Sequence, residues 1–534
     1  MFSYRFSLVF LLRALVWFAI CSIGIIFSTK SVYAVDQASE ASADRFLSGF
    51  YIYPYHMEKV SSLSGVTYES YMEEFLRRMS EGGFNFYHVA VGKNIDDWVA
   101  WSKKYNFKMI LQLDFAYLSS PSEEEARTKA PSAVDFIKKY KSESNILAFS
   151  IKEEPTPAYL NAVSVYFSEI KKEVPDANLF LLLNQGNTID HLVRPYPDML
   201  GSDRYAFWGW DGSAGGYSAT PSSALKWYTN ETRKYVKYAN DLGIPYTAVF
   251  AGLANEMIVS NEKVESGAMG EVERIKEFVE SRNQGWSRVD ESRVKFTKYY
   301  RAPENAVSAM VWLSVLSGAK SVLLWDATPT LPEDVTQYKS LSESTSKTDL
   351  SLRLFMPGVE GSDLVNPVPA VSEYASAVQE LQNFAWYIHR LSAPANSLDV
   401  AVSSGNGYAA SYDLIGYPGK VIVVVNADVG RWDSNSVGSL IGSTKKFVID
   451  DGGELENYMP NTQDALIKLD AAWPEGTVLW DISTGKQLSG GESVAISIAP
   501  GSGKMLYLGD EPGFVAVRNA AGGVISKPAL RIAE

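Results

Sequence analysis

The feature that most constrains the fold is a rhythm that runs through most of the chain. Short apolar runs alternate with amphipathic segments, beginning with the run at 46–53. The segment after it carries Met72, Phe75, Leu76 and Met79 at the spacing i, i+3, i+4, i+7, which places them on one face of a helix. Alternation of this kind predicts parallel strands joined by crossover helices.

Eight strand-and-helix units can be placed before the rhythm stops. An open doubly wound sheet commonly has about five or six strands and a Gly-rich turn after the first. Eight units therefore favour an α/β fold of the (β/α)8 TIM-barrel type, which we expect over residues 35–393. The predicted strands are 46–53, 84–91, 107–113, 146–151, 179–183, 199–205, 246–250 and 321–325. The predicted helices include 98–104, 133–140, 159–173, 224–242, 303–316 and 371–391.

After residue 391 the pattern changes to short strands separated by Gly, Pro and Asn turns, as at 421–425, 477–480 and 504–508. This pattern predicts a small antiparallel, sandwich-like β-domain over 394–510. We favour a module that packs on the barrel over a separate carbohydrate-binding domain. Residues 511–534 have weak patterning and are expected to form a tail.

The N-terminus has the pattern of a signal peptide. Arg5 and Arg13 precede an apolar stretch too short to span a bilayer comfortably, and Val32-Tyr33-Ala34 provides a small-residue cleavage site. We predict cleavage after Ala34 and a secreted or periplasmic protein without stable membrane insertion; the alternative is an uncleaved anchor. Removal of residues 1–34 would change the formal net charge from −13 to −16.

Composition excludes several kinds of site. An acidic chain argues against a nucleic-acid partner. The single cysteine, Cys21, lies in the predicted signal peptide, and the four histidines never fall at the spacing of a helical metal pair. We therefore predict no metal and no cofactor. Aromatic residues, in contrast, make up 13% of the chain, many of them after predicted strands.

In a TIM barrel, chemistry takes place at the C-terminal ends of the strands. The polar residues that follow the predicted strands are therefore the candidates for a site, and several of them are acids. They are Tyr53 and His56 after the first strand, Asp114 after the third, Glu153 and Glu154 after the fourth, Asn184 after the fifth, Asp203 and Tyr205 at the sixth, Glu256 after the seventh and Asp326 after Trp325 of the eighth. Carboxylates and aromatics without metal ligands are typical of a site that cleaves sugars.

The segment Lys152-Glu153-Glu154-Pro155 resembles a motif of the large clan of (β/α)8-barrel glycoside hydrolases, including its β-galactosidase-like branch. In that clan the fourth strand ends in Asn-Glu-Pro or Asp-Glu-Pro, and the Glu is the acid/base. The resemblance implies that Glu154 is the catalytic acid/base. Glu153 stands where the clan has Asn or Asp, so it would bind a sugar hydroxyl differently or raise the pKa of its neighbour. The alternative is a pair of acids favoured by the dipole of the following helix.

Two further segments resemble the same clan. Gly201-Ser202-Asp203-Arg204-Tyr205 is similar to its Asp-x-Tyr at strand six, and the chain from Arg301 to Ser321 is similar to its last helix and strand. A retaining member should also carry a nucleophilic Glu at the end of strand seven, but this chain has Phe250-Ala251-Gly252 there. Glu256, Asp203 and Asp326 compete for the role of the second carboxylate, and retention or inversion stays open.

We expect Glu154 to protonate the departing glycosidic oxygen, and a second carboxylate to attack the anomeric carbon or to activate water. Trp208, Trp210 and Trp325 are candidates for stacking on a sugar, and the polar segment 256–300 is expected to cover the site. Two other functions remain open at this stage: a barrel that binds glycans without cleaving them, and a polysaccharide lyase or transferase.

Overall fold

A computed structural model describes the barrel strands, most of their connections and the C-terminal sheets. The described residues are 45–54, 57–58, 61, 67–91, 94–184, 188–206, 221–251, 253–259, 295–301, 304–325, 369–392, 400–404, 406–429, 431–432, 458–459, 464–488 and 493–522.

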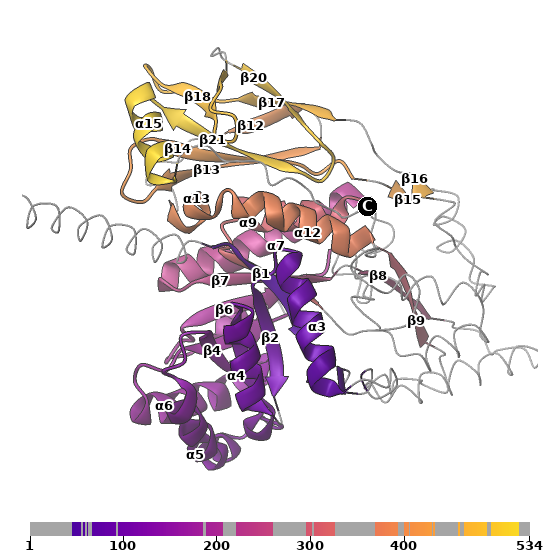
Figure 1. Cartoon of the computed structure of the whole chain (residues 1–534), viewed down its shortest axis with the longest axis vertical. Helices are drawn as coiled ribbons and strands as arrows, with labels where there is room; N and C mark the ends of the chain where they lie inside the picture. Colours follow the sequence, from indigo (N-terminus) through magenta and orange to yellow (C-terminus); the bar gives the residue numbers. More distant parts are fainter. Residues whose placement is uncertain are drawn as a thin grey trace, which may run out of the picture. The chain divides into compact units, whose positions relative to one another are not determined.

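The first structural unit of the described residues is a closed barrel of parallel strands, as the sequence predicts (Figure 1). Around the ring the order is β1, β10, β7, β6, β5, β4, β3 and β2, so the first and last strands pair and close the barrel. The strands are β1 Leu47–Ile52, β2 Phe86–Val91, β3 Lys108–Leu113, β4 Ile146–Glu153, β5 Leu179–Leu183, β6 Met199–Asp203, β7 Tyr246–Ala251 and β10 Ser321–Trp325.

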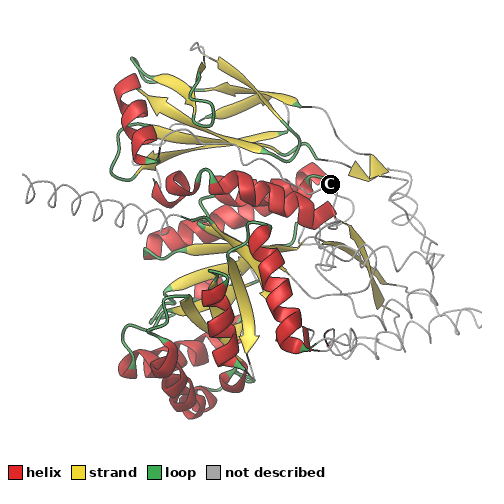
Figure 2. Cartoon of the chain, in the orientation of Figure 1, coloured by secondary structure: helices red, strands yellow, loops and turns green. Residues whose placement is uncertain are grey.

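Amphipathic helices cover the strands (Figures 1 and 2). In α3, for example, the Thr67 side chain caps the N-terminus by accepting from Ser70 N–H, and the stripe that includes Met72 and Phe75 is buried. The barrel helices are α3 Tyr68–Glu81, α4 Ile95–Lys104, α5 Glu123–Tyr140, α6 Leu160–Glu173, α7 Pro221–Leu242, α9 Ala306–Leu316, α12 Pro369–Gln382 and α13 Ala385–Arg390.

Helix α9 is different because all of its residues except Ser308 are buried. It contacts β7, β10, α7 and α12 of the barrel, and also β13 (Gly407–Leu414) and β14 (Lys420–Asn426) of the C-terminal sheet. The contact between helix and sheet is close at Gly503, where an added Cβ would lie 2.4 Å from the Trp312 ring. A helix covered on all sides must be apolar all round, which explains its sequence.

Several elements of the barrel have other bounds than the predicted ones. Helix α5 begins at Glu123, ten residues before the predicted start, and β6 ends at Asp203, two residues before the predicted end. Strand β4 extends to Glu153, two residues beyond the predicted end. The closing helix predicted at 371–391 is divided into α12 and α13 by a turn at Asn383 and Phe384. The turn buries Phe384, whose ring centroid lies 6.0 Å from that of Trp312. The packing of Phe384 therefore interrupts the helix, although the apolar pattern of the sequence is continuous.

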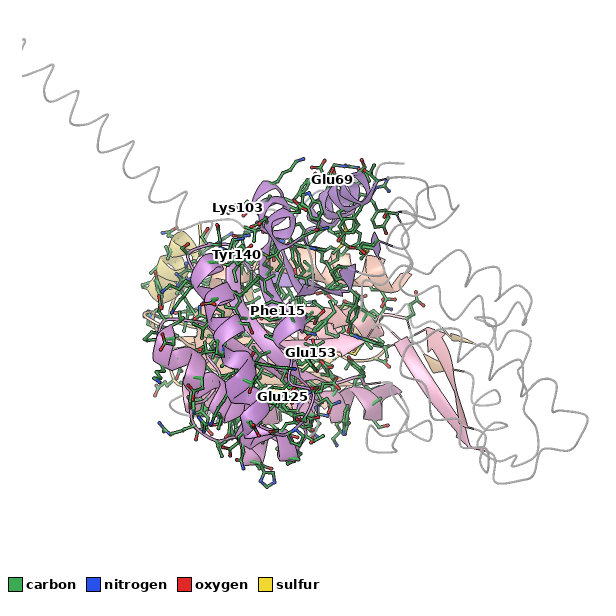
Figure 3. All side chains as sticks on the ribbon, turned by 90° about the horizontal axis from the view of Figure 1, so that it is seen from below. Glu69, Lys103, Phe115, Glu125, Tyr140 and Glu153 are labelled. Carbon is green, nitrogen blue, oxygen red and sulfur yellow. The ribbon has the colours of Figure 1, made fainter. Side chains whose placement is uncertain are left out.

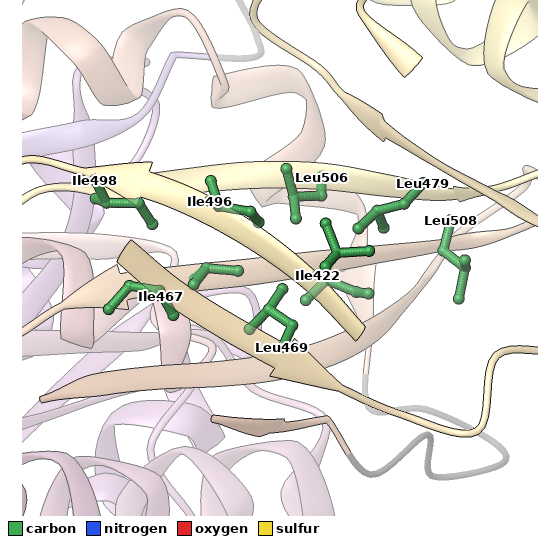
Figure 4. Packing of buried hydrophobic residues seen from close by; sticks show 10 residues of the cluster. Ile422, Ile467, Leu469, Leu479, Ile496, Ile498, Leu506 and Leu508 are labelled. Carbon is green, nitrogen blue, oxygen red and sulfur yellow. The ribbon is translucent and has the colours of Figure 1, made fainter. Parts of the chain in front are cut away.

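The C-terminal region forms two antiparallel sheets, as the sequence predicts. One has the order β11-β13-β14-β21-β18-β19 and the other β12-β17-β20. A shared core lies between them (Figure 4), with Ile422, Leu479 and Leu506 from the larger sheet and Ile467 and Ile496 from the smaller. The strands are β11 Leu391–Ser392, β12 Ala401–Ser404, β13, β14, β17 Ala465–Asp470, β18 Val478–Asp481, β19 Gln487–Leu488, β20 Ser493–Ile498 and β21 Gly503–Gly509; Arg431–Trp432 and Tyr458–Met459 pair separately as β15 and β16.

The segment expected to be a tail begins instead with helix α15, Glu511–Ala520. Asp510 caps it by accepting from Gly513 N–H, and Phe514 stacks on Trp480 with ring centroids 4.7 Å apart. The expectation was wrong for these residues because the cap and the buried Phe514 fix the helix on the sheet; residues 523–534 lie outside the described part of the chain.

The insertion after β7 carries two antiparallel strands, β8 Leu253–Val259 and β9 Lys295–Arg301. The part of the predicted covering segment between them lies outside the described residues, as does the predicted signal peptide. Among the described residues, none of the helices is long and apolar enough to cross a membrane.

The seam of the barrel is held by one tyrosine from α12. The Tyr374 hydroxyl accepts from Gly49 N–H at 2.9 Å and donates to Gly49 C=O at 2.8 Å, and Val322 C=O of β10 is 3.3 Å away. Its ring packs against those of Phe50, Phe84 and Phe250. Tyr374 therefore satisfies buried backbone groups where β1 meets β10.

We predict that Tyr374→Phe lowers the free energy of unfolding by about 1–3 kcal/mol, because Gly49 N–H loses its buried acceptor. Urea denaturation of the purified protein measures this loss. Tyr238→Phe, on the partly exposed face of α7, is the control and should change stability little. Equal stability of Tyr374→Phe and wild type would show that the seam does not depend on this hydroxyl.

Candidate functional site

The C-terminal ends of the barrel strands form a rim that carries most of the predicted site residues. Because parallel strands end at the same edge, side chains far apart in the chain meet there. The rim residues are Tyr51 and Tyr53 from β1 and the residue after it, His88 from β2, Gln112 and Asp114 at β3, Glu153 and Glu154 at β4, Asn184 after β5, Asp203 and Tyr205 at β6, and Trp325 at the end of β10.

A β-bulge at the end of β4 decides where the two glutamates point. Ser150 pairs with Phe180 and Glu153 with Leu182, so three steps on β4 face two on β5. Phe180 and Leu182 belong to the barrel interior. The extra residue therefore turns Glu153 inward, whereas simple alternation from Ala148 would have turned Glu154 inward. Figure 3 shows Glu153 toward the middle of the barrel, whereas Glu69 and Lys103 lie on peripheral helices.

Lys152, the residue before the pair, lies against aromatic rings. Its ammonium is 4.3 Å from the ring centroid of Tyr117 and 4.7 Å from that of Tyr159, and it donates to the Tyr117 hydroxyl at 3.1 Å. These contacts are cation–π interactions and a hydrogen bond, so Lys152 is engaged away from the Glu153 carboxyl.

Glu153 faces the side chains of His88 and Tyr51. Its Oε1 is 3.6 Å from His88 Nδ1, too far for a hydrogen bond, and the Tyr51 side chain also faces it. Burial, followed by the charges of Glu154 and Asp114, raises the pKa of Glu153 to about 8. Burial also lowers the pKa of His88 to about 3. At neutral pH the two side chains therefore form a neutral pair, not an ion pair.

Glu154 occupies the rim itself. Its backbone has φ of 44°, a left-handed conformation that is uncommon for a residue other than glycine and that clusters at functional sites. Its N–H donates to Leu182 C=O at 3.0 Å, which fixes the conformation. The exposed side chain accepts from Asn184 Nδ2 at 2.7 Å. Glu154 is thus accessible from solvent and oriented by the next strand.

Asp203 is the buried partner of Glu154. It is 7% exposed, it accepts from the Tyr205 hydroxyl at 3.2 Å, and Glu154 lies within hydrogen-bonding reach. Burial, followed by the hydrogen bond and charge of Glu154 and the charge of Glu153, raises the pKa of Asp203 well above its ordinary value. Two carboxyls this close cannot both ionise easily, so Asp203 keeps its proton to a higher pH than an exposed aspartate does.

An aromatic pair stands beside these acids. The Tyr205 and Trp325 rings are stacked, with centroids 5.5 Å apart and an interplanar angle of 26°. Trp325 Nε1 donates to the Tyr53 hydroxyl at 3.3 Å. At β3, Gln112 Nε2 donates to Asp114 Oδ1 at 3.0 Å. Acids, amides and aromatic rings from six strands or their ends therefore share one rim.

Of the predicted site residues, the described structure brings Tyr53, Asp114, Glu153, Glu154, Asn184, Asp203, Tyr205 and Trp325 to this rim. His56, Trp208, Trp210 and Asp326 lie outside the described residues. Glu256, expected in a loop, lies in strand β8 opposite Lys298 of β9, and its side chain is not among those described. Of the two adjacent glutamates, Glu153 has a raised pKa.

The last residue of β7 that faces the barrel interior is an alanine, Ala251. Val249 lies in the barrel interior and Ala251 follows two residues later, so Ala251 occupies the inward position at the rim. The resemblance to the retaining hydrolases would require a glutamate there.

Sequence reasoning missed Tyr51, His88 and Gln112. All three are at most 7% exposed, and their strands place them toward the interior. Alternation offered a signal, because His88 follows Phe86 by two residues and therefore shares its inward face. Among the described residues there is no group of three or more His, Cys, Asp or Glu arranged to hold a metal ion.

No family model matches the sequence, and no curated protein is significantly similar to it. Solved structures that are similar include an α-amylase from Anoxybacillus, with a TM-score of 0.42 and 10% identity over 88% of this chain and 99% of that one. A glycoside hydrolase has a TM-score of 0.43 and 11% identity, over 88% and 93%. A β-glucuronidase from an uncultured Clostridium species has a TM-score of 0.35 and 11% identity, over 53% and 43%. Likeness at this level carries no inference about substrate or about single residues.

We predict that Glu153→Gln raises the free energy of unfolding at neutral pH by roughly 1–3 kcal/mol. The wild-type Glu153 carboxyl stays protonated in the folded protein but ionises in the unfolded chain, which favours unfolding. The stability difference between Glu153→Gln and wild type therefore grows as the pH rises above about 4.5 and levels off near 8. Urea denaturation across this range measures the difference. Glu173→Gln, on an exposed part of α6, is the control; equal stability of Glu153→Gln and wild type at every pH would mean that Glu153 ionises freely in the fold.

Proposed function

We propose that the protein is a glycoside hydrolase that acts at the barrel rim. The observation that carries this proposal is the contact between the accessible Glu154 and the buried Asp203, whose pKa is raised by burial and by Glu154. A carboxyl that holds its proton more tightly than usual, in contact with an accessible glutamate, can supply the proton that glycosidic cleavage needs. The resemblance of Glu154-Pro155 to the acid/base motif of the barrel hydrolases supports the same role for Glu154.

In the proposed reaction, Glu154 donates its proton to the glycosidic oxygen as the bond between that oxygen and the anomeric carbon breaks. Asp203 lies behind Glu154 and can return a proton to it through their contact. A second carboxylate then either attacks the anomeric carbon or removes a proton from the water that attacks it. The sugar ring would lie on Trp325, whose ring is held in place by Tyr205 and Tyr53.

The second carboxylate is not Glu153 in this proposal, because a group with a pKa of about 8 is a neutral acid at neutral pH. Nor can it come from the inner end of β7, where Ala251 stands. The raised pKa of Asp203 argues against that residue in the same way. Asp326, directly after Trp325, and Glu256 of β8 remain the candidates. A separation of about 5–5.5 Å from the Glu154 carboxyl implies retention, and one of about 6.5–9.5 Å implies inversion.

Ala251 favours one alternative function, in which the barrel binds glycans without cleaving them. Such a protein would keep the aromatic pair and the rim acids for recognition. It would bind oligosaccharides but release no new reducing ends. Hydrolysis and binding are therefore measured on the same panel of glycans.

We predict that Glu154→Gln lowers kcat by about 10²–10⁴-fold, because the amide cannot donate the proton that the leaving oxygen requires. The measurement is the release of reducing ends from a panel of polysaccharides by purified protein. Glu173→Gln on the outer helix α6 is the matched control and should keep the wild-type rate. An unchanged rate in Glu154→Gln removes Glu154 from the chemistry, and a wild-type protein that binds but never cleaves supports the glycan-binding alternative.

We also propose that the protein is exported after cleavage at Ala34, supported by the basic, apolar and small-residue segments in that order. In a bacterial host, we predict a mature protein that begins at Val35 and is found outside the cytoplasm, as measured by intact mass. Ala34→Asp should block cleavage and leave the precursor. A cytoplasmic protein that retains residues 1–34 would refute the proposal.

A further inference from the structure

Several buried polar atoms without hydrogen-bond partners lie together inside the barrel, below Glu154. Among the described residues they include Tyr51 Oη, both ring nitrogens of His88, Glu153 Oε1 and Asp203 Oδ1. Tyr51 and His88 are only 2% and 1% exposed. Buried polar groups are nearly always hydrogen-bonded, and one left without a partner destabilises a fold. A group of them at one place therefore calls for a function.

These side chains face one another. The Tyr51 and His88 rings lie 4.1 Å apart, and His88 Nδ1 is 3.6 Å from Glu153 Oε1. The charges of Glu153 and Asp203 both act on Tyr51, which places the two acids around its hydroxyl. We call Tyr51, His88, Glu153 and Asp203 the inner polar cluster; it is built from β1, β2, β4 and β6.

Packing alone does not explain the cluster. His88 packs on Tyr51 and, at 5.9 Å, on Phe180, as an aromatic ring would in an apolar core. Its nitrogens add nothing to those contacts, and a phenylalanine would pack in the same way without them. The bulge in β4 likewise brings a carboxyl into the barrel interior, where it faces the Tyr51 and His88 side chains.

We propose that the inner polar cluster binds the hydroxyl groups of a neutral sugar, whose ring lies on Trp325 with its scissile oxygen at Glu154. This inference rests on the proposed function and names its substrate class. A neutral histidine offers one donor and one acceptor, a tyrosine hydroxyl offers both, and a protonated carboxyl offers a donor. Such a set matches a polyol, in which each hydroxyl also donates and accepts.

The charges around the cluster argue for a neutral sugar over a uronic acid. An ionised carboxylate in a buried site needs a cationic partner. The nearby described cations are engaged elsewhere: Lys152 stacks on Tyr117 and Tyr159, and Arg204 contacts Tyr235 and Glu231. A uronate would meet the acids Glu153, Glu154 and Asp203 instead.

The test measures binding and stability together, in the Glu154→Gln background so that ligands are not cleaved. The probes are the neutral tetrasaccharides of the cello-, malto-, manno-, xylo- and chito-series, beside tetragalacturonate and an alginate tetrasaccharide, each titrated calorimetrically. His88→Phe keeps the ring and removes both nitrogens. Tyr51→Phe removes one hydroxyl, and His191→Gln at an exposed position outside the barrel is the matched control.

We expect at least one neutral tetrasaccharide to bind and both uronates to bind more weakly or not at all. His88→Phe and Tyr51→Phe should each weaken neutral binding by about tenfold or more, and His88→Phe should raise Tm, since a buried polar group without a partner is removed. A residue with a purely structural role would lower Tm on replacement. His191→Gln should change neither quantity.

Tighter binding of a uronate than of every neutral sugar would overturn this inference and leave the hydrolase proposal standing. So would neutral binding that is unchanged in both His88→Phe and Tyr51→Phe. If no glycan of the panel binds or is cleaved by the wild-type protein, the proposed function fails and the inference fails with it.

Discussion

The backbone pairing of β1 with β10 is the constraint on which the rest of the structure depends. It closes the ring, so that β4 and β6, which carry the acids, and β10, which carries Trp325, end at one edge. Tyr374 supports this seam by bonding to both backbone groups of Gly49. In an open sheet the same residues would spread along a line, and Glu154 and Trp325 would have no common site.

Within that ring, a single extra residue in β4 sets the electrostatics of the rim. It turns Glu153 into the interior, where burial keeps it protonated, and leaves Glu154 at the surface beside Asn184. Asp203, in contact with Glu154, has a pKa that burial and Glu154 raise above its ordinary value. Three acids close together thus carry less negative charge than their number suggests, which makes proton donation at the rim physically reasonable.

Much of the fold could be predicted because strands buried on both faces read as apolar runs; β5 and β10 match their predicted bounds. The bulge in β4 could not be predicted, because it depends on the hydrogen-bond register between β4 and β5 rather than on local composition. For the same reason Glu153 and Glu154 were found by motif, but their directions were not. The inward position of His88 could have been predicted from strand alternation. Helix α15 was missed, although Asp510 and Pro512 give a helix-start signal.

The central claim is that the rim acids of the barrel act on a neutral sugar. A crystal structure of Glu154→Gln with a bound neutral oligosaccharide tests it most directly. The account predicts a sugar ring on Trp325, its hydroxyls bonded to His88 and Tyr51, and its glycosidic oxygen next to residue 154. A sugar bound only to the C-terminal sheets, with none at the ends of the barrel strands, would contradict it.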